Sequence, residues 1–405
     1  MDLLKHQMDA ERHLYSWRVG ALFMEAGTGK TRVAVNMVNR ATNCDAVLWV
    51  GPLRTINPGK GLPSVVDEIN RWGGFTVPVK YVGIESISGS SRVYLEVREF
   101  VERAENPFIV VDESLKIKNI TAKRTKRLLE LSRLAKYKLI LNGTPLSRNI
   151  LDIYAQMEFL SPKILNMSYV QFKNTFCKYK KITKDFGGWR EYSREIIVGY
   201  ANIDYLYSLI RHYVYECDLS LQVKQLYSDL YYSLDDSEHE EYYRIKEEYL
   251  QNEKLLFLNN NIFMAMTTEL QHAYCITPDK FRVLDELFTE LEKKNTIIFC
   301  RFIKSQEECK RRYPEATVLS YQKESLGLNL QHLNATIYFD KCWDYALRVQ
   351  SGRRTFRTGQ KYDCRYYDLT GNVGLEEMIN KNIAKKTSMV EYFKGITKEE
   401  LKKIL

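Results

Sequence analysis

Seven consecutive residues near the N-terminus have the composition of a phosphate-binding loop. They are Glu25-Ala26-Gly27-Thr28-Gly29-Lys30-Thr31. The glycines let successive backbone N–H groups point inward, and the positive end of a helix that begins at Lys30 adds to their attraction for an anion. Lys30 would reach the β- and γ-phosphates of a nucleotide, and the Thr31 hydroxyl would ligate Mg²⁺. Because Met24 stands where the full pattern has a further glycine, an ordinary turn remains an alternative explanation.

An acidic pair supplies the second half of such a site. Asp112 and Glu113 directly follow the apolar run at residues 107–111. Asp112 would hold Mg²⁺, directly or through water, and Glu113 would polarise the attacking water. An isolated Asp-Glu pair at a strand end is more often simply solvated. Together with the glycine loop, the pair instead favours a nucleotide site that uses Mg²⁺.

Alternating strands and helices would position these residues. Short apolar runs predict buried strands at residues 21–24, 46–50, 107–111 and 137–141, with helices between them. A second series of apolar runs lies at residues 296–300, 318–320 and 335–339. The sequence therefore predicts an α/β fold with parallel sheets, in which the glycine loop follows the first strand.

The chain of 405 residues exceeds what one hydrophobic core usually supports, so two domains are expected. We place the first at residues 1–235, with a helical and hairpin insertion at about 161–222, and the second at 236–405. Ser237 and Glu240 lie three positions apart and predict a capping box for the helix that opens the second domain.

Composition narrows the class of protein. Hydrophobic residues at 45% and charged residues at 27% are typical of a folded globular chain, and the net charge of +9 fits a polyanionic partner. The eight cysteines show no Cys-x-x-Cys spacing, which favours reduced thiols in a cytosolic protein. No apolar run reaches the length of a membrane span, so no membrane partner is expected. The basic and aromatic residues between 179 and 218 could contact DNA, but a solvated, lysine-rich loop explains them better.

The order of the motifs resembles the Swi/Snf group of superfamily-two helicase-like ATPases, in the short form found in bacteriophages and bacteria. Besides the loop and the acidic pair, the matching motifs are Lys5-His6-Gln7, Val50-Gly51-Pro52-Leu53, Ile117-Lys118-Asn119, Asn142-Gly143-Thr144-Pro145-Leu146, residues 324–330, Trp343-Asp344 and residues 350–360. The resemblance covers most of the chain and is weakest at residues 179–220. It implies two tandem RecA-like domains with helical insertions between them.

The resemblance also assigns roles at the nucleotide. Gln7 would sense adenine, and Gly327 would face both nucleotide and DNA. Arg354 and Arg357 would bring positive charge to the γ-phosphate from the second domain. Three residues apart on a helix, they share a face, so both guanidinium groups can approach one γ-phosphate.

Further residues are implied to contact DNA or to couple its movement to ATP. The expected DNA contacts are Pro52, Arg54, Lys118, Asn119 and Trp343. Gly143 and Thr144 belong to the motif that couples the nucleotide and DNA sites in the family. These contacts would be made mainly to phosphates, which predicts little sequence preference.

The resemblance implies an ATP- and Mg²⁺-dependent motor that moves along DNA, double-stranded rather than single-stranded, and clamps ATP between its domains. A strand-separating helicase in phage replication, repair or recombination remains an alternative. So does a DNA-binding protein that holds ATP without hydrolysing it, although an intact Glu113 argues against that. A bacterial or phage-infected cytoplasm is the expected location. The recruiting partner, the direction of movement and the oligomeric state are not indicated.

Overall fold

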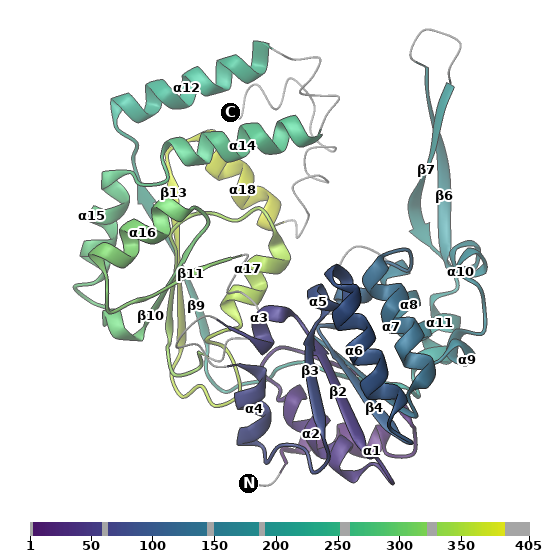
Figure 1. Cartoon of the computed structure of the whole chain (residues 1–405). Helices are drawn as coiled ribbons and strands as arrows, with labels where there is room; N and C mark the ends of the chain where they lie inside the picture. The colour runs from purple at the N-terminus through teal and green to yellow at the C-terminus, as the bar shows by residue number, and fades with distance from the viewer. Residues whose placement is uncertain are drawn as a thin grey trace. The chain divides into compact units, whose positions relative to one another are not determined.

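The computed structural model describes residues 3–58, 64–143, 150–185, 191–251, 260–321 and 330–384. The chain divides into two compact units, Met1–Leu219 and Ser220–Leu405, which we call unit 1 and unit 2. Each contains a parallel sheet flanked by helices (Figure 1). The predicted α/β class with two tandem RecA-like domains is therefore confirmed. No helix among the described residues is long and apolar enough to cross a membrane.

Unit 1 is built on a six-stranded parallel sheet with the order β3-β2-β4-β5-β1-β8. Its strands are β1 (Val19–Met24), β2 (Ala46–Gly51), β3 (Val79–Gly83), β4 (Pro107–Asp112), β5 (Tyr137–Asn142) and β8 (Val214–Cys217). The central strands are apolar and buried along most of their length, as expected for a sheet covered on both faces. Since all strands are parallel, their carboxyl ends meet at one edge, where ligands bind in open α/β sheets.

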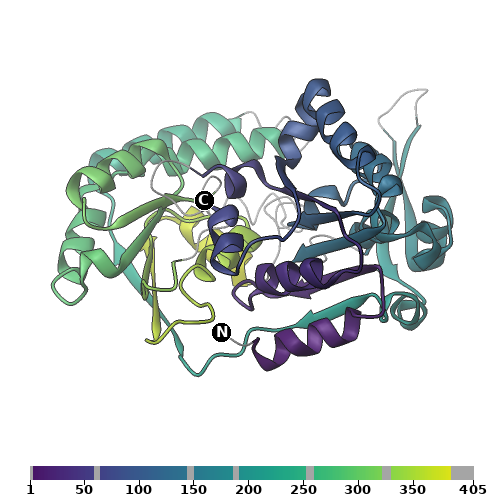
Figure 2. The same ribbon diagram turned by 60° about the horizontal axis from the view of Figure 1, so that its bottom comes forward.

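Alternation along the strands divides the core of unit 1 in two. Leu22 and Met24 of β1 pack into one cluster with α1 (Lys5–Leu14), α2 (Lys30–Arg40) and α4 (Val65–Arg71). The neighbouring Ala21 and Phe23 point to the other face of the sheet. That face is covered by α5 (Ile84–Gly89), α6 (Ser91–Glu102), α7 (Lys123–Leu134) and α8 (Leu151–Leu160). Figure 2 shows α1 and α2 side by side on the first face.

The insertion in unit 1 combines short helices with a hairpin. It contains α9 (Pro162–Leu165), α10 (Tyr169–Phe176), the antiparallel strands β6 (Cys177–Asp185) and β7 (Glu191–Tyr200), and α11 (Ile203–Ile210). The hairpin stands out from the rest of unit 1 (Figure 1). The insertion ends earlier than residue 222, because β8 already pairs with β1 in the central sheet.

Unit 2 has a five-stranded parallel sheet with the order β11-β10-β12-β13-β9. Its strands are β9 (Gln225–Tyr232), β10 (Thr296–Cys300), β11 (Thr317–Ser320), β12 (Ala335–Tyr338) and β13 (Cys364–Gly371). Its α-helices are α12 (Asp236–Gln251), α14 (Asn260–Ala273), α15 (Pro278–Leu287), α16 (Ile303–Arg312), α17 (Tyr345–Gly352) and α18 (Gly374–Ala384). The boundary lies before the predicted residue 235, because β9 pairs with β13 along its whole length.

The capping box of α12 lies two residues before the predicted one. The Asp235 carboxylate accepts the backbone N–H of Glu238 at 2.8 Å, and the Glu238 carboxylate accepts that of Asp235 at 3.1 Å. The Ser237 hydroxyl donates to Asp235 Oδ1 at 2.7 Å. The predicted pair Ser237 and Glu240 is therefore wrong, because aspartate caps a helix as well as serine does and comes first in the chain.

A buried ion pair links three elements of unit 2. The side chains of Lys280 in α15 and Asp340, just after β12, are each 2% exposed, with Nζ 3.1 Å from Oδ1. The Lys280 ammonium also lies 4.8 Å from the centre of the Phe339 ring. Asp340 Oδ2 accepts the backbone N–H groups of Arg301 and Phe302, at 2.9 and 3.4 Å, where α16 begins. The pair therefore fixes α15 and the start of α16 to the end of β12.

Substitution of Lys280 by methionine tests this pair. Lys280→Met leaves the Asp340 charge buried without its partner, which typically costs about 3–5 kcal/mol of unfolding free energy. Hydrogen exchange measured by mass spectrometry in peptides of β10 and β12 should reveal the loss in unit 2. The control is Lys294→Met, since Lys294 contacts Glu292 in an exposed pair at 3.5 Å. Equal exchange in both variants would contradict a stabilising role for the buried pair.

Candidate active site

The predicted phosphate loop connects the carboxyl end of β1 to the first turn of α2. Gly27 and Gly29 have φ angles of +92° and +85°, in the left-handed region where glycine is favoured. Gly29 is the N-cap residue of α2, which begins at Lys30. The strand, loop and helix predicted from the sequence are thus confirmed.

Helix α1 holds this loop in place. Gln7 is 3% exposed, and its Nε2 donates to the backbone oxygen of Thr28 at 3.0 Å, while His6 Nε2 lies 2.8 Å from the same oxygen. A Cβ at Gly29 would lie 2.3 Å from Gln7 Nε2. Gln7 therefore lies beside the loop, and its role at the adenine stays a prediction. The role of His6 was missed, because its loop contact lies 22 residues away in the sequence.

The Lys30 side chain folds back over the end of β1. Its ammonium donates to the backbone oxygens of Met24 at 2.8 Å and Glu25 at 3.3 Å. The Thr28 hydroxyl also donates to the Glu25 oxygen, at 2.7 Å. The Glu25 carboxylate in turn accepts the backbone N–H of Leu219 at 2.9 Å. The loop thus presents its lysine at the carboxyl edge of the sheet.

The acidic pair lies at the same edge, because Asp112 ends β4 and Glu113 follows it directly. Only β5 separates β4 from β1. Desolvation and, after it, the Glu113 carboxylate raise the pKa of Asp112 to about 7, although the Lys30 ammonium opposes the rise. Glu113 has φ +53° and ψ +52°, a left-handed conformation that non-glycine residues rarely adopt. Its backbone N–H donates to Asp112 Oδ1 at 2.9 Å. The pair is held by a local backbone turn against the phosphate loop's lysine.

Gly143, after β5, lies between the loop and the acidic pair. A Cβ there would come within 3.4 Å of the Ala26 nitrogen and 3.7 Å of the Met24 oxygen. The predicted coupling residue Gly143 therefore abuts the phosphate loop directly. Thr144 and Gly327 lie outside the described residues.

The donor set of this edge fits a Mg²⁺–nucleotide complex. No three His, Cys, Asp or Glu side chains come together as metal ligands in the described part of the chain. Nucleotide-bound Mg²⁺ needs few protein ligands, since phosphates and water complete its octahedron. The Asp112 carboxylate, whose pKa is raised, is a group that a cation would return to its charged form. Thr31, in the first turn of α2, supplies a hydroxyl.

The predicted DNA contacts after β2 differ in exposure. Arg54 is exposed on the short helix α3 (Leu53–Ile56), whereas Pro52, the residue before this helix, is buried. The Glu85 carboxylate accepts the backbone N–H of Leu53 at 2.9 Å and fixes the start of α3. Arg54 is thus free to project from a well-anchored turn.

Lys118 and Asn119 follow the 3₁₀ helix η1 (Ser114–Ile117). The Lys118 ammonium lies 3.7 Å from Asp152 Oδ2, and its side chain is 30% exposed. Asn119 Oδ1 accepts two hydrogen bonds from Thr121, from its N–H at 3.0 Å and its hydroxyl at 2.8 Å. Both side chains therefore also shape the segment that leads to α7.

Arg354 and Arg357 do not lie on a helix. Helix α17 ends at Gly352, whose carbonyl accepts the Tyr366 hydroxyl at 2.9 Å and the Thr355 hydroxyl at 3.2 Å. Because these side chains compete for the helix-terminal carbonyl, the chain continues in turns. The prediction that the two arginines share a helical face is therefore wrong. Arg354 is 5% exposed and Arg357 partly buried, both within unit 2.

Trp343 belongs to the hydrophobic core of unit 2. Its side chain is 4% exposed and meets the Phe263 ring edge-on, with ring centres 6.3 Å apart. Its backbone oxygen accepts the Asn382 side-chain amide at 2.8 Å. Trp343 therefore anchors α18 and α14 to the segment after β12.

A family model for the SNF2-related domain matches residues 76–279, just over half of the chain. The chain belongs to the SNF2-related domain family. The predicted Swi/Snf group is thereby confirmed. Among the described motif residues of unit 1, Lys30, Asp112 and Gly143 lie at the carboxyl edge of its sheet.

Relatives of this SNF2-family chain are longer proteins. It is 24% identical over 443 residues to the ATP-dependent helicase brm of Drosophila melanogaster. This alignment covers 89% of this chain and 27% of that protein. It is 21% identical over 466 residues to the ISWI chromatin-remodeling complex ATPase ISW1 of Saccharomyces cerevisiae, covering 95% and 39%. An uncharacterized ATP-dependent helicase of Mycoplasma pneumoniae is 22% identical over 334 residues, covering 73% and 32%. The chain thus spans about a quarter to two fifths of these relatives.

Among solved structures, the Sulfolobus solfataricus SWI2/SNF2 ATPase core in complex with dsDNA aligns over 100% of this chain and 97% of that one. The sequence identity is 16% and the TM-score 0.41.

Substitution of Gly29 tests the packing of the loop against α1. Gly29→Ala forces Cβ against Gln7 Nε2, so nucleotide affinity should fall at least tenfold, which a titration with a fluorescent ATP analogue would measure. Gly73→Ala is the matched control, because Gly73 also has a positive φ, +98°, but no atom lies within 4 Å of its Cβ position. If both substitutions weaken binding equally, backbone strain and not the contact with Gln7 is responsible.

Proposed function

We propose that this SNF2-family chain is an ATPase that hydrolyses ATP to move along double-stranded DNA. The observation that carries the proposal is the carboxyl edge of the unit 1 sheet. There the phosphate loop with Lys30 follows β1, and the pair Asp112 and Glu113 lies at the end of β4, with only β5 between these strands of one parallel sheet. This is the arrangement that phosphoryl transfer to water requires.

Each side chain of unit 1 has a separate task in this proposal. The N–H groups of the loop and Lys30 would bind the β- and γ-phosphates, and Thr31 and Asp112 would hold Mg²⁺, which would supply positive charge to the phosphates. Glu113 positions and polarises the attacking water. Its strained backbone supports a role in catalysis, because such conformations persist mainly where function maintains them.

Arg354 and Arg357 of unit 2 complete the site in the proposal. Guanidinium groups that contact the transferring phosphate contribute about 10³- to 10⁵-fold to the hydrolysis rate in related chemistry. Unit 1 alone would therefore bind ATP and turn it over slowly. A dependence of hydrolysis on unit 2 provides the link between the ATP cycle and movement.

DNA is proposed as the track because of family membership and the net charge of +9. The proposed contacts are Arg54, Lys118 and Asn119, which follow the carboxyl ends of β2 and β4 in unit 1. Contacts of this kind go to phosphates, so binding should weaken steeply with salt and show little sequence preference. Trp343 is not carried into this set, because its side chain is buried.

Substitutions in the site separate binding from chemistry. Glu113→Gln should lower kcat at least 100-fold and leave ATP affinity nearly unchanged, since glutamine cannot act as a base. Lys30→Ala should reduce both kcat and ATP affinity. Arg354→Ala should lower kcat with ATP binding retained, and Arg312→Ala, on the surface helix α16, is its control. Steady-state phosphate release and nucleotide titration give both quantities. If turnover is unchanged in Lys30→Ala and Arg354→Ala, these residues do not carry the hydrolysis and the motor proposal is wrong.

The track is tested by measuring ATP hydrolysis with duplex DNA, single-stranded DNA and no DNA. Duplex DNA should stimulate kcat most. The stimulation should fall as the salt concentration rises from about 50 to about 200 mM, because phosphate contacts weaken over this range. Arg54→Gln should raise the duplex concentration needed for half-maximal stimulation. If only single-stranded DNA stimulates ATP hydrolysis, the duplex proposal is wrong and a strand-separating enzyme is favoured.

A further inference from the structure

Unit 1 contains a cavity of about 490 Å³ at the edge of the sheet opposite the phosphate loop. Its walls come from the last turn of α1, the residues before β1, the end of α2 and the first residues of β4 and β5. The amino ends of β1 and β5 meet here, whereas the phosphate loop follows the carboxyl end of β1. A six-residue strand separates the two sites by roughly 20 Å, at about 3.3 Å per residue.

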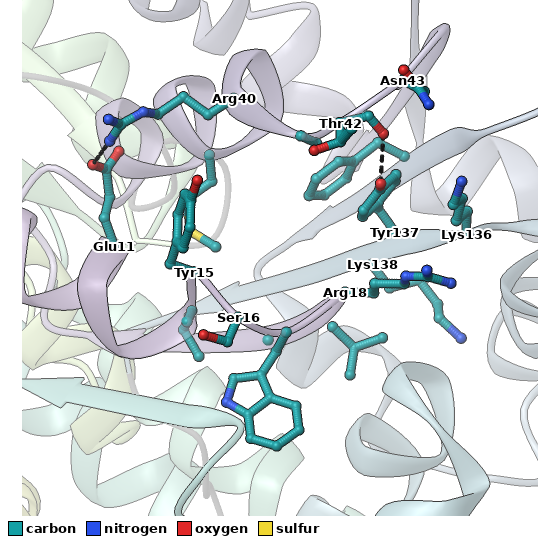
Figure 3. Close-up of a pocket in the computed structure, with 17 residues that line it drawn as sticks. Glu11, Tyr15, Ser16, Arg18, Arg40, Thr42, Asn43, Lys136, Tyr137 and Lys138 are labelled. Carbon is teal, nitrogen blue, oxygen red and sulfur yellow. Dashed lines mark hydrogen bonds and ion pairs between the residues drawn. The ribbon is translucent and has the colours of Figure 1, made fainter.

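The cavity has an excess of positive charge. Its lining contains four cationic residues, Arg18, Arg40, Lys136 and Lys138, and one acidic residue, Glu11. Glu11 is already neutralised by Arg40, at 2.9 Å. Figure 3 shows this ion pair at one side of the cavity and Arg18, Lys136 and Lys138 at the other. One side of the cavity is therefore built to receive an anion.

Lys138 is the central residue of this cationic side. Its backbone pairs with that of Arg18 at 2.9 Å, where β5 runs beside β1. Within the described residues, no carboxylate pairs with the ammonium of Lys138 or the guanidinium of Arg18, whereas Lys136 donates to Asn106 at 2.5 Å. Burial lowers the pKa of Lys138 without an opposing partner. A half-buried cation of this kind costs stability, so a ligand that neutralises it would compensate.

Aromatic rings border the same cavity. Tyr15 and Trp17 are 72% and 42% exposed at its rim, and Trp17 is supported by Tyr213, with ring centres 4.8 Å apart. On the inner wall, Tyr137 stacks on Phe108 at 5.6 Å, and its hydroxyl donates to the Thr42 oxygen at 2.6 Å. The exposed rings offer flat faces to a planar ligand, while the inner rings form a fixed wall.

We propose that this cavity binds a nucleoside phosphate, with the phosphate on Arg18 and Lys138 and the base against Tyr15 and Trp17. The volume lies within the range of about 300–1,000 Å³ typical of sites for small ligands. Cations that take the phosphate beside aromatic rings that stack the base are the combination used to bind nucleotides in single strands. The nucleoside phosphate can be free in solution or can form the end of a nucleic-acid strand.

Equilibrium dialysis with labelled AMP tests this site. The chain used is Lys30→Ala, which lacks the lysine of the phosphate loop, so that binding at the cavity is measured with little contribution from the other site. One AMP per chain is expected. Adding Arg18→Gln and Lys138→Gln should weaken its binding at least tenfold, because both charge-assisted contacts to phosphate are removed. Adding Lys126→Gln instead, on the exposed side of α7, should change nothing.

Further ligands in the same dialysis experiment show whether the nucleoside phosphate is free or ends a strand, and whether the aromatic rings take part in binding. A 5′-phosphorylated oligothymidylate that binds more tightly than AMP indicates a strand end, and equal or weaker binding indicates a free nucleotide. The melting temperature of each substituted chain shows whether it folds. It should stay close to that of the parent chain, because the substitutions remove only exposed or uncompensated charges. AMP affinity that survives Arg18→Gln and Lys138→Gln would overturn the proposal. So would inorganic phosphate that competes as well as AMP, because the rings would then have no part.

Discussion

The absence of a side chain at Gly29 is the constraint on which the site in unit 1 depends. It lets the Gln7 amide reach the Thr28 oxygen, and a Cβ would occupy the place of that amide at 2.3 Å. The contact ties the loop to α1, which packs with α2 on one face of the sheet. The loop is therefore positioned by tertiary packing as well as by its own turn. Lys30 and the acidic pair keep their relative places because the loop cannot move independently of this helix.

Two kinds of buried charge distinguish the units. In unit 2, Lys280 and Asp340 neutralise each other, and two backbone N–H groups satisfy the remaining oxygen of Asp340. In unit 1, Asp112 is desolvated next to Glu113, and the opposing effect of Lys30 leaves its pKa at about 7. A compensated pair stabilises a fold, whereas an uncompensated carboxylate costs stability and indicates a cation that arrives with the substrate.

Local sequence patterns predicted much of the fold and part of the site. The glycine loop, the acidic pair and the central strands were found because each depends on neighbouring residues. Features that depend on distant contacts were not. His6 acquires its role from an oxygen 22 residues away. Helix α17 ends before Arg354 because the Tyr366 hydroxyl, on strand β13, donates to the Gly352 carbonyl. The domain boundary was misplaced for the same reason, since β9 belongs to unit 2 through its pairing with β13.

The two edges of the unit 1 sheet are connected by α1 and α2. Near its start α1 carries Gln7, which holds the phosphate loop, and near its end it carries Glu11, which lines the cavity. Helix α2 begins at Lys30 and ends at Arg40, and the ion pair of Glu11 with Arg40 fixes the two helices together at 2.9 Å. A ligand that drew Arg40 away from Glu11 would leave a carboxylate that is only 8% exposed without its cation. That cost resists separation of the helices, so the cavity is built to be filled without moving them, and the phosphate loop keeps its geometry whether or not the opposite edge is occupied.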